Sequence, residues 1–354
     1  AFLQSNELYT AAVLPGGSYA FATLWGGVVI TDQGGRTQRI LDTQTGLIGD
    51  DVKALYVDQQ DGLWMAYESG IARAETALPI SIFDDRTGMD GVALSITRHD
   101  GDLHVGTTSG VFRLRRNLQP DGTVRPVFER VSRLRAQAFA LLSHPRGILA
   151  ATDRGVFQLR NGRTYSVGES RTAYGLHASR HTDGLVYVGY IDGVGSMQYE
   201  NGSWQSFPLI PGLDRGIFFL EEDDRGDLWA ASAYGGLWNL STSDGLQTQM
   251  SVTEIAAEGQ RPQHRFRMAY VEGEGLRIVS RNGVARPQHN ETGRTTLEPD
   301  TTVTRRLPAD AGRILNVTSA PDGDFWVAAE TDTYWFKRRG NDYAVRVPFA
   351  YVPE

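Results

Sequence analysis

The sequence predicts an all-β fold in which one four-stranded unit is repeated eight times. Three observations lead to this prediction. Short runs of β-branched and aromatic residues recur along the chain, turn residues separate them, and a Gly-containing corner returns at a drifting interval of roughly 40 to 50 residues. An interval of this size is typical of a propeller blade with four strands. We therefore expect a β-propeller of four-stranded antiparallel blades.

The repeating unit is clearest in the stretch LYVDQQDGLWMAYESGIAR, which begins at Leu55. An apolar first strand leads into a corner whose Asp and Gly residues tolerate turn geometry. The second run, LWMAY, is apolar on both alternating faces, as expected of a strand covered on both sides. A third run follows a Gly, and a more polar fourth run suits a solvated outer edge. The corner glycines of the eight copies are Gly17, Gly62, Gly101, Gly147, Gly184, Gly226, Gly275 and Gly323.

Eight units account for the length of the chain, and closing them into a ring removes exposed ends. We predict a single domain over residues 1–354, with repeats at about 5–46, 47–88, 89–131, 132–170, 171–212, 213–254, 262–306 and 310–350. Seven blades are the alternative, because the copies around Gly147 and Gly275 lack the aromatic residue that the others carry early in the second strand.

Composition excludes several classes of protein. The net charge of -7 argues against nucleic acid as a partner, since such binders usually carry a basic face. No run of about 18 apolar residues occurs, so we expect no direct insertion into a membrane. The absence of cysteine rules out disulfides, zinc-thiolate sites and Cys nucleophiles, and it suits the bacterial periplasm or cell surface.

Motifs that suggest ion binding have simpler explanations. The DQQDG corner lacks the alternating oxygen ligands and distal Glu of a calcium loop, so we interpret it as a turn. DDRTGMDG, which begins at Asp84, is richer in carboxylates but is expected to be a connecting loop. His177 and His181 lie on a predicted strand running into a turn, roughly 13 Å apart, too far for one ion. We expect no cofactor, no metal ion and no catalytic residue.

The loops between second and third strands are the candidate ligand site. In a propeller these loops open onto one face, together with the blade-to-blade connections, and the Gly corners open onto the other. Aromatic rings combined with bidentate polar groups suit a sugar or an organic acid, although ordinary solvated loops are the alternative. The candidate residues are Trp25, Tyr67, Glu68, Asp153, Arg154, Tyr190, Asp192, Tyr234, Arg281, Asn282, Glu330 and Asp332.

The unit resembles the two-component regulator propeller repeat, found in sensor domains of bacterial hybrid histidine kinases and related membrane receptors. The best matches are VDQQDGLWMAYESGIAR, from Val57, and EDDRGDLWAASAYGGLWNL, from Glu222, and the lead-in TGLIGDDVKALYVD from Thr45 is also similar. Full sensors of that family usually carry two seven-bladed rings, whereas eight units occur here. The output domain of a parent protein could therefore be a kinase or a cyclase, or be absent.

The resemblance implies a ligand-sensing domain on the periplasmic or extracellular side of a bacterial inner membrane. Its ligand would be a small molecule such as an oligosaccharide, or a partner protein, and the domain would self-associate within a receptor dimer. We expect no enzymatic activity. The alternatives are a polysaccharide lyase or glycoside hydrolase and a non-catalytic scaffold for protein interaction. A hydrolase would need two carboxylates roughly 5 to 9.5 Å apart, drawn from Glu68, Asp153, Asp192 and Glu330.

Overall fold

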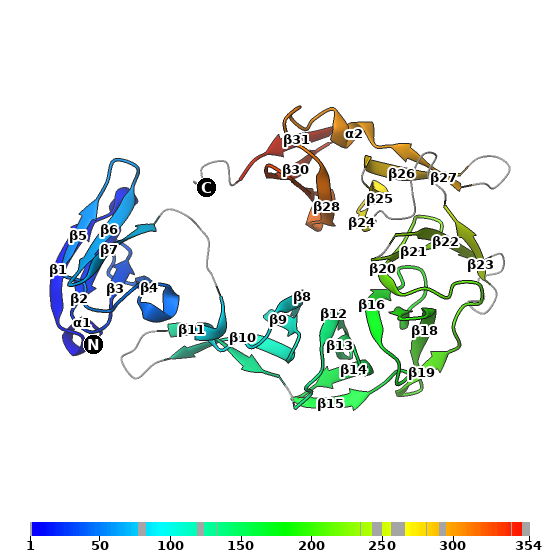
Figure 1. Cartoon of the computed structure of the whole chain (residues 1–354), viewed down its shortest axis with the longest axis horizontal. Helices are drawn as coiled ribbons and strands as arrows, with labels where there is room; N and C mark the ends of the chain where they lie inside the picture. Colours follow the sequence, from blue (N-terminus) through cyan, green and yellow to red (C-terminus); the bar gives the residue numbers. More distant parts are fainter. Residues whose placement is uncertain are drawn as a thin grey trace. The chain divides into compact units, whose positions relative to one another are not determined.

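The computed structural model describes residues 2–76, 83–118, 124–131, 133–233, 235–242, 250–255, 266–280, 282–289, 295–340 and 342–348. These residues form eight antiparallel sheets, numbered here 1 to 8 in chain order (Figure 1). The count agrees with eight blades. The helical segments are short: α1 (Phe2–Ser5), α2 (Thr301–Thr304), η1 (Pro15–Gly17), η2 (Thr43–Thr45), η3 (Asp85–Thr87) and η4 (Pro321–Gly323).

The strands of each sheet follow one another in chain order. Sheet 1 contains β1 (Leu8–Val13), β2 (Tyr19–Thr23), β3 (Val28–Thr31) and β4 (Thr37–Leu41). Sheet 2 has three described strands, β5 (Ala54–Val57), β6 (Gly62–Tyr67) and β7 (Gly70–Glu75). Sheet 3 contains β8 (Ala93–His99), β9 (Asp102–Thr107), β10 (Gly110–Leu118) and β11 (Val124–Arg130). Sheet 4 contains β12 (Ala138–His144), β13 (Gly147–Thr152), β14 (Gly155–Arg160) and β15 (Arg163–Ser166).

The remaining sheets repeat this order. Sheet 5 contains β16 (Ala173–Ala178), β17 (Leu185–Tyr190), β18 (Gly193–Glu200) and β19 (Ser203–Phe207). Sheet 6 contains β20 (Ile217–Glu222), β21 (Leu228–Ser232), β22 (Leu237–Thr242) and β23 (Met250–Glu254). Sheet 7 contains β24 (Arg267–Val271), β25 (Gly275–Ser280), β26 (Gly283–His289) and β27 (Thr295–Pro299). Sheet 8 contains β28 (Ile314–Ser319), β29 (Phe325–Ala329), β30 (Thr333–Arg339) and β31 (Asp342–Arg346).

Contacts between residues divide the chain into two compact units. The first comprises Ala1–Gly91 and Phe112–Arg130, and the second comprises Val92–Val111 and Val131–Glu354. The first unit therefore holds sheets 1 and 2, and the second holds sheets 4 to 8. The division passes through sheet 3, whose strands β8 and β9 belong to the second unit. No helix among the described residues is long and apolar enough to cross a membrane.

The hydrophobic cores lie between successive sheets. The second strands β13, β17, β21 and β25 are buried at every position, which explains why they are apolar on both faces. In β17, Val186 and Val188 pack with sheet 4, while Leu185 and Tyr187 pack with sheet 6. Equivalent clusters join sheets 1 and 2, sheets 6 and 7, and sheets 7 and 8.

In the second unit, the first strands of successive sheets run side by side: β8, β12, β16, β20, β24 and β28 (Figure 1). They approach closely. A Cβ added to Gly189, in β17, would lie 2.3 Å from the carbonyl oxygen of Ile217 in β20. Glycine at this position therefore permits the packing of sheet 5 against sheet 6.

The first strand of six sheets carries a register irregularity next to its first residue, the sign of a β-bulge. The residue that the strand register skips is bulky and apolar in every case: Tyr9, Leu94, Phe139, Tyr174, Phe218 and Leu315. Each bulge lies opposite the end of the second strand. We call this edge of a sheet, where second and third strands connect, the loop edge, and the opposite edge the corner edge.

The DQQDG corner is a turn held together by its first aspartate. Oδ1 of Asp58 accepts hydrogen bonds from the backbone N–H groups of Gln60 (2.9 Å) and Gly62 (2.8 Å). Oδ2 accepts one from the indole Nε1–H of Trp64 at 2.8 Å. The carboxylate is therefore used to tie the turn to the second strand.

Candidate functional site

The predicted loop residues of the first unit have different environments. Trp25 is 67% exposed, and Glu68 is also exposed. Tyr67 is only 9% exposed and belongs to the core between sheets 1 and 2. Burial, together with the charges of Asp50 and Asp51, raises the pKa of Tyr67 to about 12. Of these three side chains, Trp25 and Glu68 are accessible to a ligand in this unit.

In the second unit, loop carboxylates hold the segment that enters their own sheet. Asp153 accepts a hydrogen bond from the backbone N–H of Gln137 at 3.0 Å, and Asp192 forms an ion pair with Arg171. Glu330 does the same in sheet 8, where it accepts from the backbone N–H of Arg313 (3.0 Å) and pairs with its guanidinium (3.1 Å).

The other predicted loop residues are distributed as follows. Arg154 and Asn282 are exposed, and Asp332 is half-buried with its carboxylate accepting from the N–H of Thr333 at 2.8 Å. Tyr190 is 2% exposed and packs in the core between sheets 4 and 5, where burial, first of all, raises its pKa to about 12. Tyr234 and Arg281 lie outside the described residues.

An aromatic row follows the loop edge of sheets 4, 5 and 6. It consists of the bulge residues Phe139, Tyr174 and Phe218. The rings of Phe139 and Tyr174 meet edge to face with centroids 5.0 Å apart, and those of Tyr174 and Phe218 stack at 4.0 Å with an interplanar angle of 10°. All three side chains are half-buried, so part of each ring remains accessible.

Sequence reasoning missed this row, although the repeats contain its signal. A bulky apolar residue occupies the second position of the first strand in all eight copies, and the strand register skips it in six of them. The row lies at the same edge as the predicted loops of sheets 4 to 6. It adds to their polar groups a surface on which the apolar face of a sugar ring or another flat ligand can stack.

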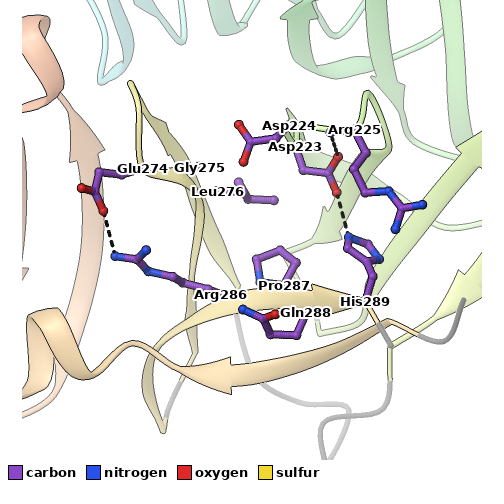
Figure 2. Close-up of a pocket in the computed structure, with 10 residues that line it drawn as sticks. All are labelled: Asp223, Asp224, Arg225, Glu274, Gly275, Leu276, Arg286, Pro287, Gln288 and His289. Carbon is purple, nitrogen blue, oxygen red and sulfur yellow. Dashed lines mark hydrogen bonds and ion pairs between the residues drawn. The ribbon is translucent and has the colours of Figure 1, made fainter. Parts of the chain in front are cut away.

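A pocket of about 200 Å³ lies at the corner edge of sheets 6 and 7, the edge opposite the predicted loops (Figure 2). The β20–β21 corner, the β24–β25 corner and the end of β26 form it. Its lining residues are Asp223, Asp224, Arg225, Glu274, Gly275, Leu276, Arg286, Pro287, Gln288 and His289. Charged side chains of both signs therefore surround it.

Two arginines and two carboxylates support one side of this pocket. Arg277, fully buried in β25, donates to Asp300 (Nε–Oδ2, 3.0 Å) and Glu274 (Nη2–Oε2, 3.3 Å). Arg286 donates to the same two oxygens at 2.9 and 3.2 Å. Burial opposes the ionisation of Asp300, but Arg286 and Arg277 outweigh it and lower its pKa. Arg277 stands at the repeat position where Trp64 stands in sheet 2.

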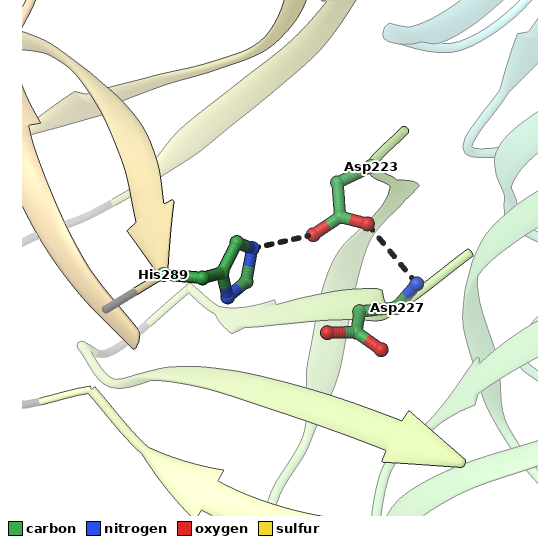
Figure 3. A group of neighbouring side chains, drawn as sticks. All are labelled: Asp223, Asp227 and His289. Carbon is green, nitrogen blue, oxygen red and sulfur yellow. Dashed lines mark hydrogen bonds and ion pairs between the residues drawn. The ribbon is translucent and has the colours of Figure 1, made fainter. Parts of the chain in front are cut away.

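Three groups that could bind a metal ion lie at the other side of the pocket (Figure 3). Ligand atoms of Asp223, Asp227 and His289 are all within 4.8 Å of one another. Asp223 is buried, and the other two are half-buried. Burial and the charge of Asp223 raise the pKa of Asp227, since two carboxylates share this space.

The histidine pair considered in the sequence is not part of this group. His177 lies 3.4 Å from Glu221 and 3.6 Å from Glu222, both on β20. His181 uses Nε2 to contact the backbone oxygen of Asp223 at 3.1 Å. The two imidazoles therefore have separate partners.

Comparison with known proteins identifies the fold. No protein-family model and no curated protein sequence matches the chain. Among solved structures, the extracellular domain of a protein assigned to the hybrid two-component systems of B. thetaiotaomicron matches 98% of the chain, with a TM-score of 0.64 and 13% sequence identity. The extracellular domain of a protein assigned to the one-component systems of the same organism matches 96%, with a TM-score of 0.54 and 14% identity.

The chain spans about half the length of these two structures, 47% and 48%. Their likeness gives the chain the β-propeller fold, as the resemblance of its repeat implied. A catalytically inactive virginiamycin B lyase from Staphylococcus aureus matches 75% of the chain and 87% of the lyase, with 14% identity and a TM-score of 0.49. A likeness of this size carries no argument about activity.

Proposed function

We propose that this chain is the ligand-sensing propeller of a bacterial signalling receptor, located on the periplasmic or extracellular side of the inner membrane. Its likeness to extracellular domains of signalling proteins, over 98% of its length in one case, supports this role. Ligand binding would act by favouring one receptor arrangement over another, which requires different affinities for the two. Self-association in a receptor dimer is part of the same proposal.

The observation that carries the proposed ligand class is the aromatic row of Phe139, Tyr174 and Phe218. Aromatic rings with polar groups beside them are typical of sites that bind sugars and other small organic molecules. Arg154 of sheet 4 and the Arg171–Asp192 pair of sheet 5 supply polar groups at this edge. The proposed ligand is therefore an oligosaccharide, and a partner protein with an exposed aromatic or sugar-bearing segment is the alternative.

The contacts of the loop carboxylates favour binding of a sugar over its hydrolysis. A glycoside hydrolase needs one carboxyl group as acid and a second as base or nucleophile. Asp192 and Glu330 are paired with arginines, and Asp153 is bound to a backbone N–H. These three carboxylates already serve to hold the entering segments of their sheets, and the fourth candidate, Glu68, is exposed.

The proposal is tested by screening the chain against a panel of plant and bacterial oligosaccharides by thermal shift and calorimetry. We expect a ligand that raises the melting temperature and binds with a stoichiometry of one. Tyr174→Ala and Phe218→Ala should weaken binding at least tenfold, because each removes a stacking surface.

Tyr270→Phe is the matched control, since it changes an aromatic residue at the corner edge of sheet 7 and should leave binding unchanged. Mass spectrometry of the glycans after incubation separates binding from catalysis. Cleaved products would overturn the sensor proposal in favour of an enzyme. Unchanged affinity in Tyr174→Ala and Phe218→Ala would overturn the location of the site.

A further inference from the structure

The corners of sheets 2 and 6 contain the same hydrogen bond from a tryptophan to an aspartate, but the residues around the aspartate differ. In sheet 2, Trp64 pairs across the strands with Arg73, whose Nε donates to Oδ2 of Asp58 at 2.7 Å. The arginine lowers the pKa of Asp58. A Cβ added to Gly62 would lie 2.3 Å from Nη2 of Arg73, so glycine leaves room for the guanidinium.

In sheet 6, both positions have changed. Trp229 pairs across the strands with Asn239, which is neutral, and Asp227 stands where sheet 2 has Gly62. At these two positions a positive charge is lost and a carboxylate is gained, while Arg225 stands where sheet 2 has Gln60. The two changes fit together in space, because the shorter Asn239 leaves room for a side chain that Arg73 would exclude.

Asn239 places a buried amide beside the Asp227 carboxylate. The side chain is 4% exposed, and among the described residues its Nδ2 makes no hydrogen bond of ordinary geometry. The two ends of an amide have nearly the same shape, so half a turn about χ2 presents Oδ1 to the corner instead.

A histidine from the neighbouring sheet completes the corner. Nε2 of His289 lies 3.7 Å from Oδ2 of Asp223, and Nδ1 lies 3.0 Å from Oγ1 of Thr295. Oδ2 of Asp223 also accepts from the indole of Trp229 at 2.9 Å. Metal-binding histidines and carboxylates are usually oriented by such second contacts.

We propose that Asp223, Asp227 and His289 bind a divalent transition-metal ion such as Zn²⁺ or Mn²⁺, with the Asn239 amide oxygen or water as a further ligand. The ion would supply the positive charge that Arg73 supplies in sheet 2. One imidazole with two carboxylates suits these ions better than Ca²⁺ or Mg²⁺, which prefer oxygen ligands alone. Ligands around Zn²⁺ lie roughly 3.4 Å apart, so groups up to 4.8 Å apart must close by up to about 1.4 Å.

The surroundings of the corner are consistent with an ion there. The pocket of about 200 Å³ reaches Asp223 and His289, which gives an ion access and leaves space for water ligands. Two carboxylates and one imidazole thus face the same space within 4.8 Å of one another. The site is independent of the loop edge and of the proposed sensor function.

Metal titration of the EDTA-treated chain tests the proposal. Isothermal calorimetry with Zn²⁺ or Mn²⁺ should give one site per chain, and Co²⁺ should give visible absorption bands that indicate nitrogen and oxygen ligands. Ca²⁺ should bind at least tenfold more weakly. His289→Gln and Asp227→Asn should each weaken Zn²⁺ binding about 100-fold or more, and Thr295→Val roughly tenfold.

A double variant provides the control that retains the fold. Asp227→Gly with Asn239→Arg recreates the arrangement of sheet 2, so it should fold without metal and lose the site. His144→Gln, in sheet 4, should keep the affinity of the original chain. Two outcomes would overturn the proposal: no metal binding by the original chain, or binding that the double variant and His289→Gln both retain.

Discussion

The indole Nε1–H of Trp229 donates to Oδ2 of Asp223 at 2.9 Å, and both side chains are buried. Trp64 and Asp58 make the same bond at 2.8 Å in sheet 2. In each case the aspartate also accepts backbone N–H groups of its own corner, at 2.9 and 3.1 Å in sheet 6. One carboxylate thus fixes both the turn and the strand that follows it.

Replacing Trp229 with Phe should lower the free energy of unfolding by about 1.5–3 kcal/mol, the range for a hydrogen bond to a charged group. The phenyl ring is smaller than the indole and leaves a cavity between sheets 6 and 7, so a packing loss adds to that of the bond. Urea denaturation measures the change.

Trp204→Phe is the matched control. Its Nε1 is buried without a hydrogen-bond partner among the described residues, so removing that donor should leave stability unchanged or raise it. Equal losses in the two variants would show that ring size matters and the bond to Asp223 does not.

Arg277→Met should lower the free energy of unfolding by about 3–5 kcal/mol, because it leaves the buried carboxylate of Asp300 with one arginine in place of two. The guanidinium also lies 4.5 Å from the ring centroid of Phe325, a contact that methionine replaces only in part.

A double-mutant cycle with Asp300→Asn tests this coupling. The double variant should be more stable than the sum of the two single losses predicts, by about 0.5–3 kcal/mol. Simple additivity of the two substitutions would contradict the role of the ion pair.

Asp227→Asn should stabilise the metal-free chain at pH 8, and the gain should shrink as the pH falls toward 4. The folded state raises the pKa of Asp227, so it holds this proton more tightly than the unfolded chain. Stability is therefore lost as the pH rises through the folded pKa, and asparagine avoids that loss. Denaturation in EDTA at several pH values measures the difference.

Asp300→Asn should behave in the opposite way. The folded state lowers the pKa of Asp300, so its contribution is present above the unfolded pKa and is lost as the pH falls through the folded one. This variant should be destabilised at pH 8 and approach the original chain in acid. The same pH trend in both variants would contradict these assignments.

Gly189→Ala should cost about 1–3 kcal/mol of unfolding free energy, because its Cβ would lie 2.3 Å from the backbone oxygen of Ile217 and force sheets 5 and 6 apart. Gly162→Ala, a turn position with φ of +71° and open space around it, should cost roughly 1 kcal/mol from backbone strain alone. A larger loss at Gly162 would contradict the packing argument.

Features that depend on short stretches of sequence could be predicted. The eight sheets follow from local alternation and turn residues, and the DQQDG corner follows from comparison of the copies. The burial of Tyr67 was also within reach, because it shares a strand face with Leu63 and Met65, which are fully buried. Its position next to the β6–β7 loop instead led to the prediction of an accessible side chain.

Features that depend on partners far apart in the sequence could not be predicted in this way. In the sequence, the copy that contains Arg277 differs from the others in lacking the aromatic residue of the second strand. The partner of Arg277, Asp300, follows β27 at the far side of the same sheet. Asp223 and His289 meet only because sheets 6 and 7 pack together. The aromatic row depends on bulges, which shift register by one residue and leave no mark on a single repeat.

The placement of each core between two sheets also determines which local unfolding exposes the backbone amides to solvent. Amides of β17 can exchange with solvent only when sheet 5 separates from both neighbours, since Val186 and Val188 face one core and Leu185 and Tyr187 face the other. Amides of the outer strand β19 need no such separation. Native-state hydrogen exchange should therefore show a gradient of protection within one sheet, with the slowest amides in the strand that two cores share.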